Sequence, residues 1–541
     1  MTTAGVKRPF ASSAGSDAFE VAKPKLKSIR HEEASSVTPP SRIDSLSPPS
    51  GKVPGFRHDA TLVLVGLRGS GKSTLAVMAS TALNRIVIDL EAAFQRAHGV
   101  TSSSYRKSHG SEDGQLQQAE ILRDVLKHNA TGRILVCSWI DQQVRSLLRE
   151  FAMTNPVVHI VRDAEAIKAH LRVDNDQKVE SLLAFATPFF RECSSFEFFN
   201  ITEKSLPATE SAPLQSAFIP SLTLKRTETH FTKFLSLLYP VGTIPFVDSA
   251  FPLASVPLEQ RQFTYIIPLA MSDILSAVFD IEEAICGADA VQVTVDIPDV
   301  DDSSDNGVAT STLAAQITRA VAIVRRSTVL PIICHLRVHG AAGASTWDVY
   351  MKLIVHAFKL APEMVTIDLR LDIDNMKRAL RSRYRSKVMG CYETFSRAEP
   401  WSSQYWRALY KKAVDVGCDT ARLTRPATSP RDNIEVAQFR AKLETGPDGR
   451  IPAAAYNSGP IGRTSACFNS LLTVTTTAPA SEMAKETVID QAITPMQATA
   501  ALFASFIYEP MKLYVFGAKV DYSMSPIMHN SALEAYGMPH D

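Results

Sequence analysis

The chain has 541 residues, 45% of them hydrophobic and 21% charged, and its net charge at pH 7 is +1. This length predicts about three or four domains, and the balanced charge argues against a protein held on nucleic acid by its overall charge. The seven cysteines form no CxxC pair, which indicates reduced, partly buried thiols in a cytosolic or nuclear protein. No apolar run approaches the roughly 18 residues that a membrane span needs, so we expect no membrane partner.

Residues 1–57 predict a disordered tail, because they are rich in Ser, Pro and Lys and contain few large apolar side chains. Two basic clusters lie in this tail, Lys7-Arg8-Pro9 and Lys23-Pro24-Lys25-Leu26-Lys27. Such clusters are typical of nuclear-import signals and also of solvated tails. Both interpretations stay open, and we expect the protein in the nucleus and the cytoplasm.

Residues 58–205 alternate strand-like and helical runs, which predicts a parallel three-layer α/β domain. The strand-like runs are Leu62–Val65, Arg85–Ile88, Ile134–Cys137 and Val157–Val161.

The first of these strands leads into Gly66-Leu67-Arg68-Gly69-Ser70-Gly71-Lys72-Ser73, which matches the phosphate-binding pattern G-x-x-x-x-G-K-[ST]. Its glycines let successive backbone N–H groups converge on a phosphate, and the following helix adds its positive end. We predict that Lys72 reaches the outer phosphates and that Ser73 takes a metal, so ATP with magnesium is the expected cofactor. The alternative is a Gly-rich turn without a ligand. The candidate nucleotide-binding residues are Gly66, Gly69, Ser70, Gly71, Lys72, Ser73 and Thr74.

At the end of the second strand, Asp89-Leu90-Glu91 places two carboxylates on one side of the chain. They could serve a metal or a polyol hydroxyl, or they could lie in the solvated start of a helix. Together with the P-loop and the length of the domain, this pair resembles shikimate kinase. The resemblance implies that Asp89 supports the metal and that Glu91 holds the hydroxyls of shikimate.

Other positions of shikimate kinase do not match. The family's Gly-Gly-Gly substrate loop is Cys137-Ser138-Trp139 here, its shikimate-binding arginine falls near Leu116, and a further arginine becomes Ala186. The segment 173–182, where the family has a lid arginine, contains none. Phosphoryl transfer depends on positive groups around the developing charge, and losing one can cost several orders of magnitude. We therefore predict a nucleotide pocket without kinase activity.

Residues 206–240 predict a connector with a short helix at Phe231–Leu238. In residues 241–510, eight strand-like runs are separated mostly by helical stretches, which predicts a (β/α)8 barrel with its site at the carboxyl ends of the strands. These runs are Thr264–Ile267, Ala290–Val295, Ile332–Leu336, Met364–Leu369, Lys387–Cys391, Thr420–Thr424, Pro452–Tyr456 and Leu471–Thr475.

This second series resembles type I 3-dehydroquinate dehydratase. The matching residues are Gly287–Val291 leading to Val295-Asp296, Asp432-Asn433, and Gly459–Gly462 with Asn469. In that family a lysine on the sixth strand condenses with the substrate ketone, and Arg422 stands at this position. A guanidinium stays protonated, so it cannot act as the amine nucleophile of a Schiff base.

The other catalytic positions of that family are also changed. The general-base histidine falls at Glu393, and the remaining positions hold Gln292, Thr294, Arg370 and Ala466. Arg337 and Gln491 match substrate-binding positions. Because binding needs complementary donors and not a nucleophile, we predict a barrel that binds a carboxylated cyclitol without converting it.

Thr494–Ile507 predicts the closing helix of the barrel, and residues 511–541 predict the start of a further α/β module with a strand at Lys512–Phe516. Ser523-Met524-Ser525-Pro526 is similar to the S-x-S-P motif at the opening of shikimate dehydrogenase. That similarity implies that Ser523 and Ser525 hold a substrate carboxylate. We expect a truncated module that docks on its neighbours or frays, because so short a unit cannot bury its own face.

Kinase-like, dehydratase-like and dehydrogenase-like modules in this order resemble the last three activities of the fungal pentafunctional arom polypeptide. With degraded catalytic residues and a disordered tail, they resemble the fungal quinate repressors. This resemblance implies a transcriptional repressor of quinate-utilisation genes that binds a zinc-cluster transcription activator and senses a quinate-pathway metabolite. The alternatives are an arom-like enzyme with active dehydratase or kinase domains, and a P-loop ATPase that switches by hydrolysis. No basic recognition helix or zinc-ligand spacing is visible, so we predict no direct nucleic-acid contact.

Overall fold

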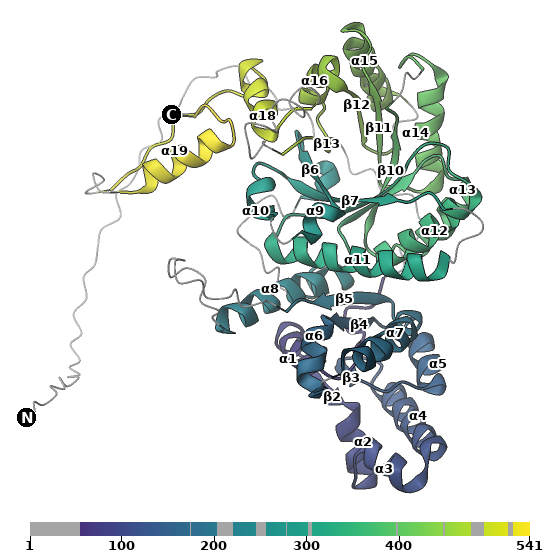
Figure 1. Cartoon of the computed structure of the whole chain (residues 1–541). Coiled ribbons are helices and arrows are strands. Elements are labelled where there is room, and N and C mark those ends of the chain that lie inside the picture. Colours follow the sequence, from purple (N-terminus) through teal and green to yellow (C-terminus); the bar gives the residue numbers. More distant parts are fainter. Residues whose placement is uncertain are drawn as a thin grey trace, which may run out of the picture. The chain divides into compact units, whose positions relative to one another are not determined.

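The computed structural model describes residues 55–173, 175–202, 220–244, 256–276, 279–300, 306–395, 399–446, 450–477, 492–517 and 523–540 (Figure 1). Nearly all of the predicted tail lies outside these residues, as does the candidate ligand residue Gln491. Two parallel sheets organise the described chain, one of five strands and one of eight.

The five-stranded sheet has the strand order β2-β3-β1-β4-β5. Successive residues of β1 point to opposite faces, so Leu64 lies in one apolar core and Val65 in another. A sheet with a core on each face confirms the predicted three-layer domain. Its strands are β1 (Leu62–Val65), β2 (Ile86–Asp89), β3 (Arg133–Cys137), β4 (Val157–Arg162) and β5 (Phe196–Asn200). The last of these, β5, was not among the predicted strands.

Seven helices accompany this sheet before the connector. They are α1 (Lys72–Leu83), α2 (Leu90–His98), α3 (Ser102–His109), α4 (Ser111–His128), α5 (Gln142–Phe151), α6 (Ala164–Leu171) and α7 (Asp176–Cys193).

The predicted connector contains a long helix, α8 (Pro220–Leu238), whereas the sequence predicted a helix only at Phe231–Leu238. Phe231 and Phe234 of α8 are fully buried in the same core as Leu64 of β1. Their helical spacing puts them on one apolar face, and this face covers the sheet. The connector is therefore a packed part of the P-loop domain.

All eight predicted barrel strands form, and they lie parallel in the order β12-β11-β10-β9-β8-β7-β6-β13. The ring is nearly closed, and the backbone N–H of Val474 in β13 donates to the Tyr456 hydroxyl of β12 at 3.0 Å. The strands are β6 (Tyr265–Ala270), β7 (Ala290–Ile297), β8 (Ile332–Val338), β9 (Met364–Asp368), β10 (Lys387–Glu393), β11 (Thr420–Pro426), β12 (Ala453–Ser458) and β13 (Thr473–Val474).

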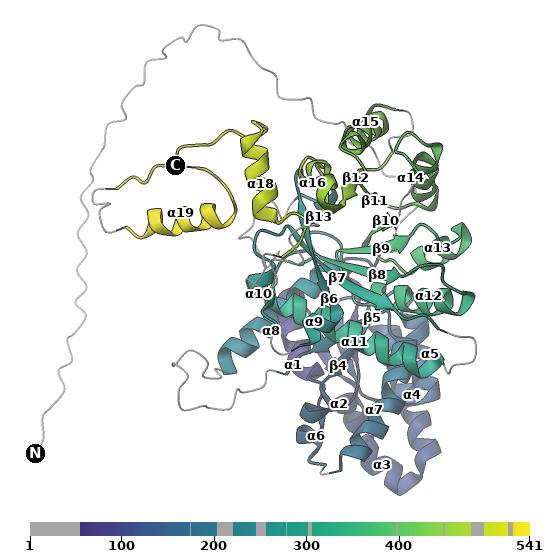
Figure 2. The same ribbon diagram turned by 45° about the horizontal axis from the view of Figure 1, so that its top comes forward.

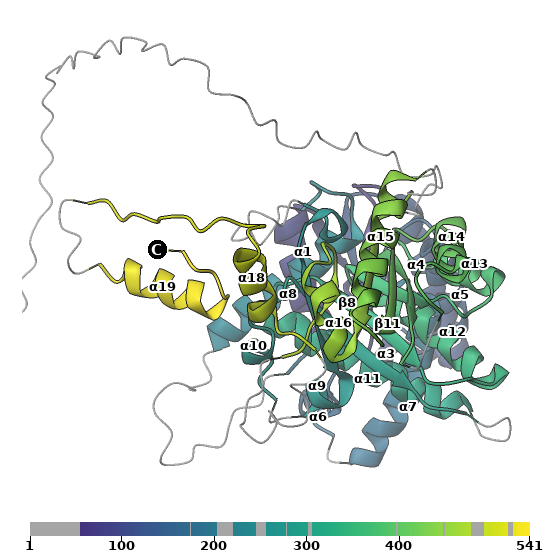
Figure 3. The same cartoon turned by 90° about the horizontal axis from the view of Figure 1, so that it is seen from above.

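Helices lie outside these strands, as Figure 2 shows for α14, α15 and α16 beside β11 and β12, and Figure 3 shows the same three helices from above. Together with the strand order, they confirm the predicted (β/α)8 fold. The helices are α9 (Met271–Leu275), α10 (Ile281–Ala284), α11 (Asn306–Ser327), α12 (Ala344–Lys359), α13 (Ile373–Leu380), α14 (Gln404–Val416), α15 (Arg431–Thr445), α16 (Gly459–Cys467) and α18 (Pro495–Ala504), with a short 3-10 turn at Leu258–Gln260.

By length and composition alone, one described helix could cross a membrane, the stretch Gly307–Ser327 within α11. In the structure its Ile317, Val321 and Val324 are buried in the core of the barrel.

The segment after α18 only partly follows its prediction. The closing helix α18 forms and begins at Thr494, whose side chain accepts the N–H of Gln497 in a capping box. A helix, α19 (Ser525–Ala535), begins within the S-x-S-P motif, at its second serine. The predicted strand Lys512–Phe516 is wrong, because these residues pair with no strand of the described chain and Phe516 is 90% exposed. Without a neighbouring strand, an extended segment has no ladder to join.

We expect Phe231→Ala to lower the free energy of unfolding by about 3–5 kcal/mol, because it empties a fully buried position between α8 and the sheet. Urea denaturation of the full chain measures this loss. The control is Leu224→Ala on the same helix, at a position that is 51% exposed, where we expect a change within about 0.5 kcal/mol. Equal effects of the two substitutions would contradict the packing of α8 as a core element.

Candidate nucleotide site and barrel pocket

The phosphate-binding loop between β1 and α1 has the backbone that its sequence requires. Gly66, Gly69 and Gly71 have φ angles of 145°, 88° and 91°, which L side chains rarely adopt. A Cβ at Gly71 would lie 2.3 Å from the Asn200 side-chain nitrogen. Ser70 is buried, while Ser73 and Thr74 are exposed on the first turn of α1. The loop therefore fits a phosphate at the amino end of a helix.

Lys72 occupies the interior of this loop. Its ammonium group donates to the Leu67 carbonyl at 2.5 Å and lies 3.4 Å from the Ser70 hydroxyl. Burial lowers the pKa of Lys72 to about 8, so the side chain is still mostly protonated at neutral pH. A phosphate in the loop would offer this buried charge a stronger partner than a carbonyl.

Two residues that were not predicted from the sequence donate hydrogen bonds to backbone carbonyls of the phosphate-binding loop. Arg162, at the end of β4, donates to the Gly69 carbonyl at 3.1 Å. Asn200, at the end of β5, donates to the Ser70 carbonyl at 2.9 Å. The only sequence signal for them is their position at the carboxyl ends of strands, where ligand sites of parallel sheets form.

The carboxylate pair after β2 is used within the protein. Asp89 is the N-cap of α2 and accepts the N–H groups of Glu91 and Ala92, as expected for a helix start. Glu91 accepts hydrogen bonds from the backbone N–H and the hydroxyl of Ser102 at 2.9 and 2.8 Å. The Trp139 indole N–H donates to it at 3.0 Å, and Arg68 lies 3.5 Å away.

These contacts determine the charge and the surroundings of Glu91 in the structure. Burial raises the pKa of Glu91, but the Trp139 and Ser102 donors outweigh it and leave the pKa below its ordinary value. Both carboxylate oxygens of Glu91 therefore already have donors, and Trp139 stands where a shikimate kinase has small glycines. Through these hydrogen bonds Glu91 links α2, α3 and the loop that follows β3, and its role toward a polyol stays a prediction.

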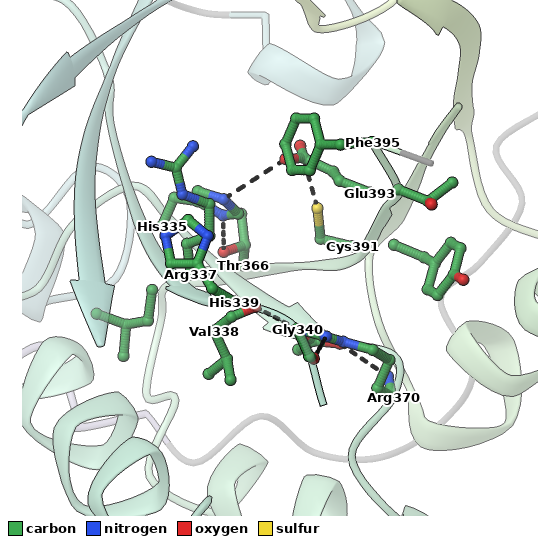
Figure 4. Close-up of a pocket in the computed structure, with 14 residues that line it drawn as sticks. His335, Arg337, Val338, His339, Gly340, Thr366, Arg370, Cys391, Glu393 and Phe395 are labelled. Carbon is green, nitrogen blue, oxygen red and sulfur yellow. Dashed lines mark hydrogen bonds and ion pairs between the residues drawn. The ribbon is translucent and has the colours of Figure 1, made fainter. Parts of the chain in front are cut away.

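A pocket of about 450 Å³ opens at the carboxyl ends of β8, β9 and β10, the end at which barrels of this kind carry their sites (Figure 4). Polar side chains from each of the three strands line it. They include His335, Arg337, His339, Thr366, Asp368, Arg370, Cys391 and Glu393, with Phe395 at the rim.

Arg422 of β11 is fully buried and pairs with Glu393 of the neighbouring strand. Its guanidinium lies 2.8 Å from the Glu393 carboxylate and donates to the Gln292 amide oxygen at 2.8 Å. Burial raises the pKa of Glu393, but the charge of Arg422 outweighs it and keeps the carboxyl ionised at neutral pH. The positions of the predicted nucleophile and base thus hold a cation and an anion that neutralise each other.

His335, which sequence reasoning did not single out, lies between Thr366 and Glu393 in the pocket (Figure 4). Its Nδ1 is 2.8 Å from the Thr366 hydroxyl, and its Nε2 is 3.8 Å from the Glu393 carboxylate. Burial lowers the pKa of His335 to about 4, so the imidazole is neutral at pH 7. Its place two residues before Arg337 on the same face of β8 is the signal that could have found it.

The arginines at the mouth of the pocket already have partners. Arg337 donates to Asp296 of β7 at 2.6 and 3.1 Å, and His339 lies 2.9 Å from the same carboxylate. Arg370 pairs with Asp368 at 2.7 Å and donates to the Val338 carbonyl at 2.6 Å. A carboxylate ligand would have to share Arg337 with Asp296 or replace it.

The remaining predicted site residues do not reach this pocket. Ala466 of α16 is buried in a core with Cys467 and Leu471. Ser523 and Ser525 contact each other, with the Ser525 N–H donating to the Ser523 hydroxyl at 3.3 Å. Among the residues that the structure describes, no group of three His, Cys, Asp or Glu side chains could hold a metal ion.

Comparison with known families agrees with both folds. Residues 68–203 match the shikimate kinase family, and residues 265–503 match the type I 3-dehydroquinase family. The chain thus combines a shikimate kinase-like domain with a type I dehydroquinase-like barrel.

The whole chain is similar to the quinate repressor protein of Emericella nidulans, with 36% identity over 516 residues that cover 90% of this chain and 56% of the relative. The quinate repressor protein of Talaromyces stipitatus is 28% identical over 488 residues, covering 90% and 55%. The pentafunctional AROM polypeptide of Mycosarcoma maydis is 25% identical over 521 residues, covering 93% and 30%. The chain is therefore a relative of the quinate repressors and of the arom polypeptides, and it spans about half the length of the repressors it matches.

A solved structure of the dehydroquinate dehydratase and shikimate dehydrogenase from S. pombe AroM is 24% identical to this chain. It covers 52% of each chain with a TM-score of 0.44.

We expect that Arg422→Lys alone does not create a Schiff-base enzyme. The new ammonium group would lie beside Glu393, which favours its charged form, and no general-base histidine stands at position 393. Borohydride reduction in the presence of dehydroquinate, followed by mass spectrometry, measures a trapped imine. Arg422→Met controls for labelling of other lysines. An adduct in Arg422→Lys that is absent from Arg422→Met would show that the pocket retains more of the catalytic apparatus than its residues indicate.

Proposed function

We propose that this chain is a transcriptional repressor of quinate-utilisation genes that senses an acid of the quinate and shikimate pathway in its barrel and converts no substrate. The observation that carries this proposal is the Arg422–Glu393 pair, which stands where a type I dehydroquinase needs a neutral amine and a base. The names of the two repressor relatives support the regulatory role.

Binding without conversion is chemically reasonable in this pocket. A pocket of about 450 Å³ has the size of a small-molecule site, and Arg337, His339 and Arg370 offer donors for carboxylate and hydroxyl groups. Recognition of a carboxylated cyclitol requires such donors, whereas dehydration also requires groups that act only in the transition state.

The partner in this proposal is a zinc-cluster transcription activator, which the repressor would hold inactive in the nucleus or the cytoplasm. An acid ligand can relieve repression only if it binds the free repressor and the activator-bound repressor with different affinity. The proposal includes no direct contact of the repressor with nucleic acid.

The P-loop domain is proposed to bind ATP with magnesium without transferring phosphate. Lys72, Ser73 and the amide groups of the loop fit the phosphates. The site for the phosphate acceptor differs from that of a shikimate kinase. The Trp139 indole N–H donates to Glu91 at the position where a kinase would hold shikimate. Nucleotide binding would then have a structural or regulatory role.

We expect quinate, shikimate or dehydroquinate to raise the melting temperature of the full chain, and Arg337→Ala to abolish the rise. Ligand at 100-fold its Kd stabilises the folded state by about 2.7 kcal/mol, which thermal unfolding resolves easily. The control is Arg378→Ala, at an exposed position of α13 outside the pocket, which should keep the full shift. A shift that survives in Arg337→Ala would remove this pocket from the mechanism.

We expect calorimetry to detect Mg-ATP binding to the wild-type chain and to lose it in Lys72→Ala, because that substitution removes the buried charge inside the loop. Lys127→Ala, at an exposed position of α4, is the matched control and should bind as the wild type does. ATP hydrolysis that depends on Lys72 would instead favour the ATPase hypothesis.

A further inference from the structure

A buried carboxylate joins the P-loop domain to the barrel. Glu197 of β5 is fully buried and accepts hydrogen bonds from Arg191 at 2.7 and 2.8 Å and from His159 of β4 at 3.2 Å. The Thr318 hydroxyl of α11, a barrel helix, donates to the same carboxylate at 2.8 Å. Burial raises the pKa of Glu197, but the hydrogen bonds from Arg191 and His159 outweigh it and hold the pKa well below its ordinary value. The barrel thus supplies one donor to a charge of the P-loop domain.

Further polar contacts cross the same junction, where β5 contacts α11. Arg319, the next residue of α11, lies 3.6 Å from Asp163, which also accepts the backbone N–H of Thr202 at 3.1 Å. Lys359 at the end of α12 donates to the Arg191 and Ser194 carbonyls at 2.5 and 2.9 Å. Two neighbouring residues of α11 therefore contact Glu197 of β5 and Asp163, the residue that follows β4.

The same two strands reach the phosphate-binding loop at their carboxyl ends. His159 pairs in register with Glu197, and three residues further on Arg162 pairs with Asn200. Arg162 and Asn200 are the residues that bond to the loop carbonyls, and Arg162 also donates to the Thr202 hydroxyl at 3.1 Å. In a loop whose amides face a phosphate the carbonyls face away from it, so these bonds depend on the conformation of the loop.

On the barrel side, α11 joins the two strands that carry the arginine–carboxylate pair at the mouth of the pocket. Asp296 lies near the end of β7, before α11, and Arg337 lies near the end of β8, after it. A ligand carboxylate that replaces Asp296 as the partner of Arg337 breaks the ion pair between the ends of β7 and β8. A shift of α11 is the movement through which such a change would reach Glu197 and Asp163.

We propose that ligand binding at the P-loop and in the barrel pocket is energetically coupled through β4, β5 and α11. This inference rests on the proposed function, which supplies the two ligands. Coupling of this kind is reciprocal, so each ligand changes the affinity for the other by the same factor, typically about 5–150-fold.

Calorimetry on the full chain tests the coupling. The Kd of Mg-ATP is measured alone and with saturating quinate, shikimate or dehydroquinate, and the Kd of each acid is measured with and without saturating Mg-ATP. We expect one acid to give equal factors of at least about fivefold in both directions. In Thr318→Val combined with Arg319→Ala, we expect each ligand to bind alone as in the wild type and the coupling factor to fall below about twofold, because the α11 contacts with Glu197 and Asp163 are both removed.

Two variants control for side effects of the substitutions. Thr318→Ser retains a hydroxyl and should retain the coupling factor. Thr312→Val changes an exposed threonine of α11 that bonds only within its own helix, and it should also retain the factor. If the double variant fails to fold, Arg319→Ala alone tests the second contact, because its side chain is 51% exposed. An unchanged coupling factor in Arg319→Ala would then contradict coupling through α11.

The outcomes separate this inference from the function on which it rests. A factor near one in the wild type, with both ligands bound, overturns the coupling and leaves the proposed function intact. A full factor in the folded double variant overturns the route through α11. Failure of Mg-ATP or of all three acids to bind overturns the coupling together with that part of the proposed function.

Discussion

The charge of Glu197 constrains how the P-loop domain and the barrel can meet. An ionised carboxylate removed from water is costly unless hydrogen-bond donors surround it, and here the donors come from α7, β4 and the barrel helix α11. A small displacement would break the Thr318 bond before water could replace it, so intermediate positions are the unfavourable ones. The apolar core around Phe196 and Phe234 includes Ala361 of the barrel, which opposes full separation. A junction with few favourable arrangements is the kind of element on which two distant sites can act.

The two candidate sites differ in which of their functional groups remain free. In the barrel, Arg422 and Glu393 neutralise each other, while Arg337 stays partly exposed at the mouth and is held by a carboxylate that a ligand could replace. In the P-loop domain, Glu91 accepts hydrogen bonds from Ser102 and Trp139, whereas Lys72 contacts a backbone carbonyl and a hydroxyl. In both places the residues at the enzyme-like positions make contacts within the protein. The groups that would bind an anion have kept an exchangeable partner.

The sequence predicted best those features that depend on residues close together in the chain. Buried parallel strands read as continuous apolar runs, and for that reason all eight barrel strands were predicted. In β5 the run Phe196–Phe199 is interrupted by Glu197, whose burial depends on Arg191 nearby and on His159 and Thr318 far away in the chain. The first half of α8 reads as polar, so only its apolar end was predicted. At Lys512–Phe516 local preference indicated a strand, but strand pairing is a tertiary property and the partner is missing from the described chain.

The candidate site residues were likewise predicted where neighbouring residues define them, and missed where distant residues do. The P-loop was predicted because glycines, a lysine and a serine at fixed spacing define it. Arg162 and Asn200 were not predicted, because they reach the loop only through the strand order of the folded sheet. Arg422 and Glu393 were each identified as replacements, but their contact depends on the register of β10 and β11. The Arg422–Glu393 contact also constrains which substitutions the barrel tolerates. Replacing Glu393 alone would leave the buried charge of Arg422 without its partner and lower the free energy of unfolding by about 3–5 kcal/mol. Selection for a stable fold alone would therefore preserve the pair, because a change at one position leaves the charge at the other without its partner.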